Sequence, residues 1–405
     1  MKRILWLSHI VPFPLESGVI LRSYNLIKEL SKKHSITMIA FNQTDNCPSQ
    51  DDLDTATTEL SKFCSIEGVV DIPKDVSLAS RITLPIKGLL PNRTYTNLWL
   101  KSQAYKDLVH RVLIENEFDV IHVDTISLAQ YLPSDTRSYT VLNHHNIESL
   151  MMLRRASQEK NLLKKFYFYQ EGKKLKAYEA QVCPQFDLNI TCSDLDIERL
   201  STVTSVRKCI SVPNGVDTKY FSPSESVQVE NRLIFTGSLA WYPNADAVRF
   251  FFNKVWNRLK DIVPNVTITI IGKSPPSWLM ALSKSDKQVM VLGYVDDVRP
   301  YMDESSVYIC PIKDGGGTKL KVLNALSMGM CIVADPIACE GISVENGGSV
   351  ILASTPDEYV RSIADILNNE SDRLRIGRQA RDLAIKNYDY TEIGGLLSDS
   401  LDAAH

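Results

Sequence analysis

The chain has 405 residues, more than a single hydrophobic core usually organises, so two domains are expected. Lys and Arg (45) and Asp and Glu (48) nearly balance, for a formal net charge of −3, which excludes a globally basic nucleic-acid-coating protein. A hydrophobic fraction of 44% also excludes a disordered chain.

The cysteines and the N-terminal segment indicate in which cellular compartment the protein is expected. The eight cysteines are scattered, with no CxxC pair and no histidine at metal-ligand spacing, so we expect reduced thiols and no metal site made from them. The start MKRILWLSHIVPFP resembles a signal peptide, but Ser8, His9 and two prolines interrupt its apolar run below the roughly 7–15 residues that a secretory segment needs. We therefore expect a first buried strand and a cytoplasmic protein.

Apolar runs of strand length alternate with helical patterns along the chain. In the first half the expected strands are Ile4–Leu7, Ser35–Phe41, Val120–Val123, Tyr139–Leu142 and Leu188–Thr191. In the second half they are Leu233–Phe235, Val266–Ile271, Val289–Leu292, Val307–Cys310 and Cys331–Ala334, separated by helices such as Ala245–Leu259 and Lys319–Met328. Because such alternation is typical of parallel sheets covered on both faces, the sequence predicts two doubly wound α/β domains.

The expected domain boundary lies near a turn signal followed by a polar stretch. Pro213, Asn214 and Gly215 form the turn, and residues 222–230 are polar and linker-like. We predict an N-terminal domain at 1–213 and a C-terminal domain at 224–388. The last helix, 389–405, can pack on either domain, the N-terminal one included.

Two loops at strand ends in the first half can carry a ligand. The loop Ser8–Gly18 ends where a helix begins, and Gly18 there lets backbone N–H groups approach an anion or hydroxyl. This loop is not a GxGxxG motif, and a plain turn explains it equally well. His144 and His145 follow a strand directly, where at most one imidazole faces a ligand; the alternative is a pair that caps the helix or fills polar niches.

The most informative segment is glycine-rich. Gly315–Gly317 follow a strand and open a helix, so exposed N–H groups and the positive helix end can hold a phosphate. Lys319 and Lys321 add charge, and Asn324 is placed to reach ribose hydroxyls. A glycine turn with solvated lysines is the alternative.

Taken together, these segments resemble glycosyltransferases of the GT-B fold, in particular the retaining group known as family 4. The segments that carry the resemblance include FDVIHVD at 118–124, HHNIES at 144–149, SVPNGVDTKYFSP at 211–223, FTGSLAWYPNADAVRFF at 235–251, IIGKSPP at 270–276, VLGYVDDVRPYM at 291–302 and GGGTKLKVLNALSMGMCIVAD at 315–335. The resemblance implies two Rossmann-like domains, with a nucleotide-sugar held mainly by the C-terminal one.

The resemblance also implies roles for single residues. His145 would contact the transferred sugar, Gly18 would lie beside the donor phosphates, and Lys319 would meet the pyrophosphate together with Gly317. The remaining donor-binding positions that it implies are Gly237, Lys273, Gly293, Gly315, Gly316, Thr318, Lys321 and Asn324.

One position departs from the family's pattern. The family often has two glutamates eight positions apart in the last segment, and here Gly316 and Asn324 stand there. A carboxylate hydrogen bond contributes roughly 1.5–3 kcal/mol against about 1 for a neutral amide, so Asn324 is expected to weaken the ribose contact.

The resemblance implies a retaining transfer without metal or cofactor, from a UDP- or GDP-linked sugar to a saccharide or lipid-linked acceptor of surface polysaccharide or glycolipid synthesis. The alternative is a catalytically weak nucleotide-binding or scaffolding subunit; an epimerase or a phosphorylase fits less well. The pair Asp194 and Asp196 is interpreted as part of a helix cap after Ser193, not as a metal site.

Two further segments concern the acceptor and its surroundings. The sequence predicts a single helix over Ser149–Ala180, with basic residues interleaved with aromatic ones. Such a helix suits peripheral contact with the inner face of a membrane, and a solvated helix face is the alternative. Loops within Cys64–Tyr95 are expected to shape the acceptor pocket.

Overall fold

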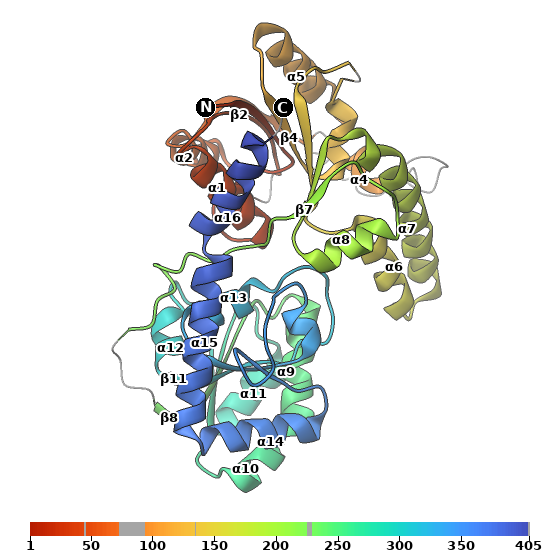
Figure 1. The fold of residues 1–405 in the computed structure, drawn as a ribbon. Helices are drawn as coiled ribbons and strands as arrows, with labels where there is room; N and C mark the ends of the chain where they lie inside the picture. The colour runs from red at the N-terminus through yellow and green to blue at the C-terminus, as the bar shows by residue number, and fades with distance from the viewer. Residues whose placement is uncertain (44–45, 73–93, 134, 225–228, 404–405) are drawn as a thin grey trace. The chain divides into compact units, whose positions relative to one another are not determined.

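The computed structural model describes residues 1–43, 46–72, 94–133, 135–224 and 229–403 (Figure 1). It divides into two compact units: Met1–Pro213 together with Ile393–His405, and Asn214–Glu392. Most of the expected acceptor loop (73–93) and part of the expected linker (225–228) lie outside the described residues. No helix within the described ranges is long and apolar enough to cross a membrane.

The first unit is built on a seven-stranded parallel sheet with the order β3-β2-β1-β4-β5-β6-β7. Its strands are β1 (Arg3–Ser8), β2 (Ser35–Asn42), β3 (Ser65–Asp71), β4 (Val120–Asp124), β5 (Tyr139–Asn143), β6 (Leu188–Thr191) and β7 (Cys209–Ser211). Alternate side chains of β1 enter two different cores: Ile4 and Trp6 face one, and Leu5 and Leu7 face the other. The sheet is therefore buried on both faces, as the continuous apolar runs predict.

Helices cover both faces of this sheet. They are α1 (Gly18–Leu30), α2 (Gln50–Leu60), α4 (Tyr95–Trp99), α5 (Gln103–Glu115), α6 (Glu148–Gln158), α7 (Leu162–Val182), α8 (Asp194–Ser201) and α16 (Tyr390–Asp402). Helices α1, α2 and α16 share one core with β1, whereas α5 and α8 pack into the other. Ser193 caps α8, its hydroxyl accepting from the N–H of Asp196, as the sequence predicts.

The predicted single helix over Ser149–Ala180 is wrong, because the chain breaks between α6 and α7. The side chain of Asn161 accepts hydrogen bonds from the N–H groups of Leu163 and Lys164, which starts a new helix at that point. The two helices pack together at Gly172, where an added Cβ would lie 2.8 Å from Leu153. Figure 1 shows them side by side as a helical hairpin.

The C-terminal helix α16 completes the core of the first unit. Ile393, Leu397 and Leu401 join the cluster around β1, and a Cβ on Gly394 would lie 2.2 Å from the Cβ of Glu29 on α1. Lys2 donates to the carbonyl of Leu401 at 2.6 Å.

We expect Leu397→Ala to lower the free energy of unfolding by about 2–5 kcal/mol, because it leaves a cavity in a fully buried position. Urea unfolding of the full chain measures this loss. Leu396, the next residue, is 47% exposed and provides the matched control. Equal effects of Leu396→Ala and Leu397→Ala would contradict this packing.

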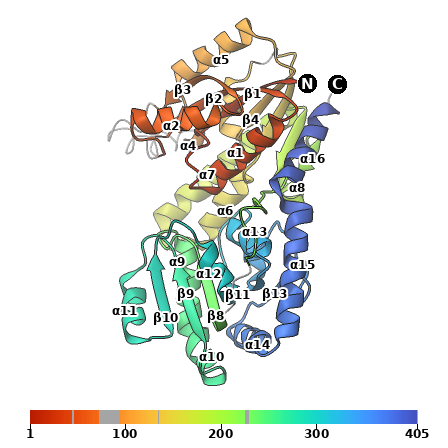
Figure 2. The same cartoon turned by 90° about the vertical axis from the view of Figure 1, so that its left-hand side faces the viewer.

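The second unit carries a six-stranded parallel sheet with the order β10-β9-β8-β11-β12-β13. Its strands are β8 (Val229–Thr236), β9 (Thr267–Ile271), β10 (Val289–Gly293), β11 (Ser305–Cys310), β12 (Cys331–Ala334) and β13 (Ile351–Leu352). Its helices are α9 (Tyr242–Phe251), α10 (Asn257–Ile262), α11 (Ser277–Ser285), α12 (Arg299–Asp303), α13 (Leu320–Ser327), α14 (Pro356–Leu367) and α15 (Glu370–Tyr388). Figure 2 shows α13 and α15 toward the β13 side of this sheet and α11 beside β10.

The helix expected over Ala245–Leu259 is not a regular α-helix. A π-helical turn, Phe252–Trp256, joins α9 to α10. The chain nevertheless forms two doubly wound parallel α/β units, which is the fold class predicted from the sequence.

Candidate functional site

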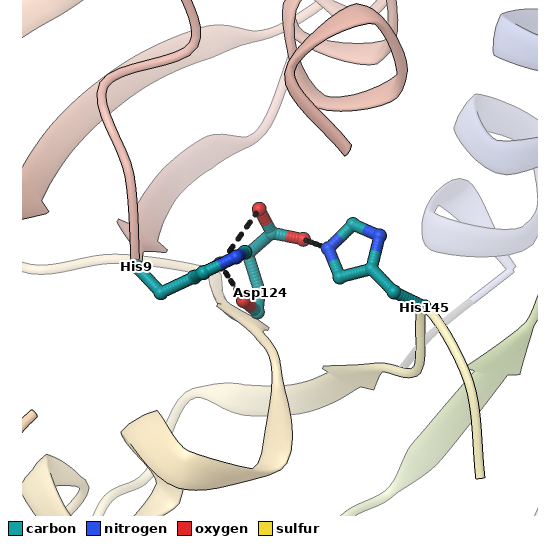
Figure 3. Close-up of side chains that lie close together, drawn as sticks. All are labelled: His9, Asp124 and His145. Carbon is teal, nitrogen blue, oxygen red and sulfur yellow. Dashed lines mark hydrogen bonds and ion pairs between the residues drawn. The ribbon is translucent and has the colours of Figure 1, made fainter. Parts of the chain in front are cut away.

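The first site lies at the carboxyl edge of the sheet in the first unit (Figure 3). His9 follows β1, Asp124 is the last residue of β4, and His145 follows β5 by two residues. Strands β1, β4 and β5 are direct neighbours, so these three residues, far apart in sequence, come together.

Asp124 links the two imidazoles. Nε2 of His145 donates to Oδ1 of Asp124 at 2.9 Å. Nδ1 of His9 donates to the main-chain oxygen of Asp124 at 2.8 Å and lies 3.9 Å from its Oδ2. The remaining ring nitrogens, Nε2 of His9 and Nδ1 of His145, have no hydrogen-bond partner among the residues that the structure describes.

The carboxylate of Asp124 is fully buried and well supplied with donors. Ser23 donates to Oδ2 and Asn143 to Oδ1, each at 2.7 Å. Burial opposes ionisation of this group, but His145, through its charge and hydrogen bond, holds the pKa of Asp124 well below its ordinary value. Asp124 is therefore a fixed negative charge that orients His145.

Two other histidines at this edge, His9 and His144, are neutral. Burial lowers the pKa of His9 to about 4 and that of His144 also to about 4. Nε2 of His144 lies 2.9 Å from Oδ1 of Asn189, so His144 fills a polar niche. Of the predicted pair, only His145 belongs to the cluster. Gly18 is exposed at the start of α1, after the cap residue Ser17.

The second site is the glycine-rich loop between β11 and α13 in the second unit. Gly315 and Gly317 have φ angles of +100° and +71°, which glycine adopts without strain. Nζ of Lys319 donates to the carbonyls of Gly315, Gly316 and Gly317 at 2.8, 3.2 and 2.9 Å. The three carbonyl oxygens of the loop therefore point toward this lysine. Within the described ranges, the N–H groups of Gly316, Gly317 and Thr318 meet no acceptor. The loop thus presents bare donors at a helix N-terminus.

Beside this loop, the side chain of Lys321 lies against the C-terminal end of β8. Its Nζ donates to Oδ1 of Asn244 at 2.6 Å and lies 4.8 Å from the ring centre of Phe235. Burial lowers the pKa of Lys321 to about 8. Gly237 has a φ of +144°, and a Cβ there would lie 2.1 Å from Nζ of Lys321, so a side chain at this position would displace the lysine.

The remaining predicted donor-binding residues lie nearby on the same unit. Nζ of Lys273 stands 4.8 Å from the ring centre of Tyr294, and Gly293 accepts from the N–H of Gly272 at 2.7 Å. Asn324 is half-buried on α13, and its side chain has no hydrogen-bond partner among the residues described. It is available to a ligand.

Sequence reasoning did not single out His9 and Asp124. The sequence feature that could have identified them is their position, because each lies just after a predicted strand. Finding the cluster required knowing that β4 pairs with β1 across more than a hundred residues.

Comparisons with known proteins agree with this architecture. Residues 230–369 match the family model described as glycosyl transferases group 1. An uncharacterised 44.6 kDa protein in the cps region of Klebsiella pneumoniae is 20% identical over 97% of this chain and 98% of its own.

Solved structures show the same fold over the whole chain. HepE of Anabaena, in complex with UDP, is 15% identical with a TM-score of 0.65, and sucrose-phosphate synthase of Thermosynechococcus elongatus is 14% identical with a TM-score of 0.67. Each comparison covers 100% of both chains.

Proposed function

We propose that this chain is a glycosyltransferase of the glycosyl transferases group 1 type, which transfers a sugar from a nucleotide-linked donor to a saccharide or lipid-linked acceptor. The observation that carries the proposal is the loop at Gly315–Gly317. It lies within the part matched by the family model and presents bare N–H groups at the start of α13. Such an arrangement suits the phosphates of a nucleotide-sugar.

The donor is a UDP-sugar in this proposal. The N–H groups of Gly316, Gly317 and Thr318 take the diphosphate, with Lys319 and Lys321 supplying charge. Asn324 hydrogen-bonds the ribose, and Gly293 and Lys273 line the nucleotide. The solved complexes of HepE with UDP and with UDP-glucose support UDP over GDP.

Transfer proceeds with retention and needs no metal ion or cofactor in this proposal. The bond between the sugar carbon and the diphosphate oxygen breaks while a bond from that carbon to the acceptor oxygen forms on the same face. The departing diphosphate takes the acceptor's proton. His145, oriented by Asp124, hydrogen-bonds the transferred sugar.

Calorimetric titration with UDP, GDP and ADP tests the donor assignment without knowledge of the acceptor. We expect UDP to bind selectively. If none of these nucleotides binds, the proposal is wrong. UDP binding without any turnover would support the alternative, a nucleotide-binding scaffolding subunit.

We expect Asn324→Glu to tighten UDP binding by about 3–10-fold, because a carboxylate accepts ribose hydroxyls more strongly than an amide does. The same titration measures the change. UDP lacking its ribose hydroxyls provides the control, since its affinity should not respond. Unchanged affinity for UDP itself would show that Asn324 does not touch the ribose.

The acceptor belongs to surface polysaccharide or glycolipid synthesis in this proposal, and the first unit selects it. The cps-region relative supports this class. The α6–α7 hairpin supports a lipid-linked acceptor on the inner face of a membrane. At its tip Leu162, Leu163 and Phe166 are 80%, 83% and 59% exposed, and Lys164 and Lys165 between them are exposed as well. Apolar and basic side chains together suit an anionic bilayer surface.

Co-sedimentation with lipid vesicles tests this contact. We expect binding to anionic but not to neutral vesicles, and about a 30-fold loss for the double variant Lys164→Gln, Lys165→Gln, at roughly 1 kcal/mol for each lysine. The exposed pair Lys101 and Lys106, changed in the same way, is the matched control. If both double variants lost the same amount of vesicle binding, the binding would reflect general charge, and the proposed contact at the hairpin tip would be wrong.

A further inference from the structure

The His9–Asp124–His145 cluster has the chemistry of a metal site. Each residue offers one ligand atom, and these atoms all lie within 4.8 Å of one another. Two imidazole nitrogens and one carboxylate suit zinc, cobalt or nickel, whereas magnesium and calcium prefer oxygen ligands. Within the described part of the chain, no other group of three such side chains comes together in this way.

The spacing of the ligand atoms fits a small ion. Zinc binds nitrogen at about 2.0–2.1 Å and carboxylate oxygen at about 2.0–2.2 Å, so neighbouring ligands in a tetrahedral site are about 3.4 Å apart. The distance from His145 Nε2 to Asp124 Oδ1 is 2.9 Å, and that from His9 Nδ1 to Asp124 Oδ2 is 3.9 Å. These distances bracket the required value, so small side-chain rotations would admit an ion.

Binding also requires lone pairs where the two imidazoles now carry protons. Nε2 of His145 and Nδ1 of His9 donate to Asp124, so each ring must move its proton to the other nitrogen. Those other nitrogens have no hydrogen-bond partner among the described residues. The shift of tautomer therefore sacrifices no further hydrogen bond within the protein.

A second layer of hydrogen bonds already holds the carboxylate. Ser23 and Asn143 donate to the two oxygens of Asp124 from buried positions, and Arg22 donates to Oδ1 of Asn143 at 3.1 Å. Metal-binding carboxylates are oriented in this manner by their neighbours.

We propose that His9, Asp124 and His145 bind one divalent ion of the zinc class, with water completing its coordination. This binding does not depend on the proposed function.

Titration of the full chain with Co²⁺, followed by visible absorption, tests the binding. We expect uptake of one ion for each chain, with the spectrum of nitrogen and oxygen ligation, and its displacement by Zn²⁺. His9→Gln and His145→Gln should each weaken Co²⁺ binding by more than about 100-fold, and Ser23→Ala by about 10-fold. His110 is exposed on α5, and His110→Gln is the matched control that should bind as the parent chain does.

Three outcomes would overturn the proposal: no Co²⁺ uptake, equal uptake by the folded His9→Gln and His145→Gln variants, or a thiolate charge-transfer band that assigns the ion to cysteine. Titration of the same metal-free preparation with UDP tests the proposed function separately. A chain that binds Co²⁺ but not UDP would contradict the donor assignment alone, and the reverse result would contradict the metal site alone.

Discussion

Replacing His145 with alanine is expected to lower kcat by roughly 10²-fold while leaving UDP affinity nearly unchanged. The imidazole is oriented by Asp124 and presents its free nitrogen to the sugar in the proposed mechanism. The groups proposed to bind the phosphates belong to the second unit. Steady-state rates with calorimetric UDP titration separate the two effects.

His110→Ala is the control for this change, since His110 is an exposed histidine on a helix of the same unit. Its rate should match that of the parent chain. A loss of UDP affinity as large as the loss of kcat in His145→Ala would contradict the assigned sugar contact.

Lys321→Met is expected to weaken UDP binding by about 10–100-fold at pH 7.5, where the lysine is mostly protonated. Because the pKa of Lys321 is about 8 in the free protein, its charge is lost as the pH rises through that value. A bound diphosphate favours the charged form and raises this pKa, so UDP affinity should fall between pH 7.5 and 9.5. Titrations at several pH values measure the slope.

The Lys321→Met variant should lose most of this pH dependence. At high pH, the UDP affinity of the parent chain should fall toward that of the variant. Lys284→Met, which changes an exposed lysine on α11, should keep the parent's pH dependence. If Lys321→Met kept the same slope, the titrating group would lie elsewhere.

The long apolar strands of both sheets could be predicted from the sequence, but the short edge strands could not. Strands β1, β2, β4 and β9 are mostly apolar, buried runs with clear ends. In contrast, β7 and β13 have three and two residues, and β3 contains Glu67 and Gly68 and is mostly half-buried. Such segments form because a neighbouring strand offers hydrogen bonds, which no local pattern reveals.

The helix break at 159–161 was missed for a different reason. Basic and aromatic residues on both sides of Asn161 favour a helix, and the pattern gives no apolar period to interrupt. The break depends on the Asn161 side chain competing for backbone N–H groups and on α7 folding back against α6 at Gly172.

The candidate sites divide in the same way. The glycine-rich loop and His145 were predicted because local order suffices: a strand, special residues, then a helix. The partners of those residues come from distant segments, as Asn244 does for Lys321 and Asp124 for His145. Sequence therefore indicated the groups that could bind, and the strand order supplied the groups that orient them.

The position of α16 has a consequence for synthesis. Leu397 and Leu401 belong to the same core as Ile4, so the first unit lacks part of its interior until α16 has been synthesised. The second unit, a continuous segment, can complete its own core earlier. Folding should thus run against the usual N-terminal-first order, and a nascent chain halted before Ile393 should be protected from proteolysis in the second unit before the first.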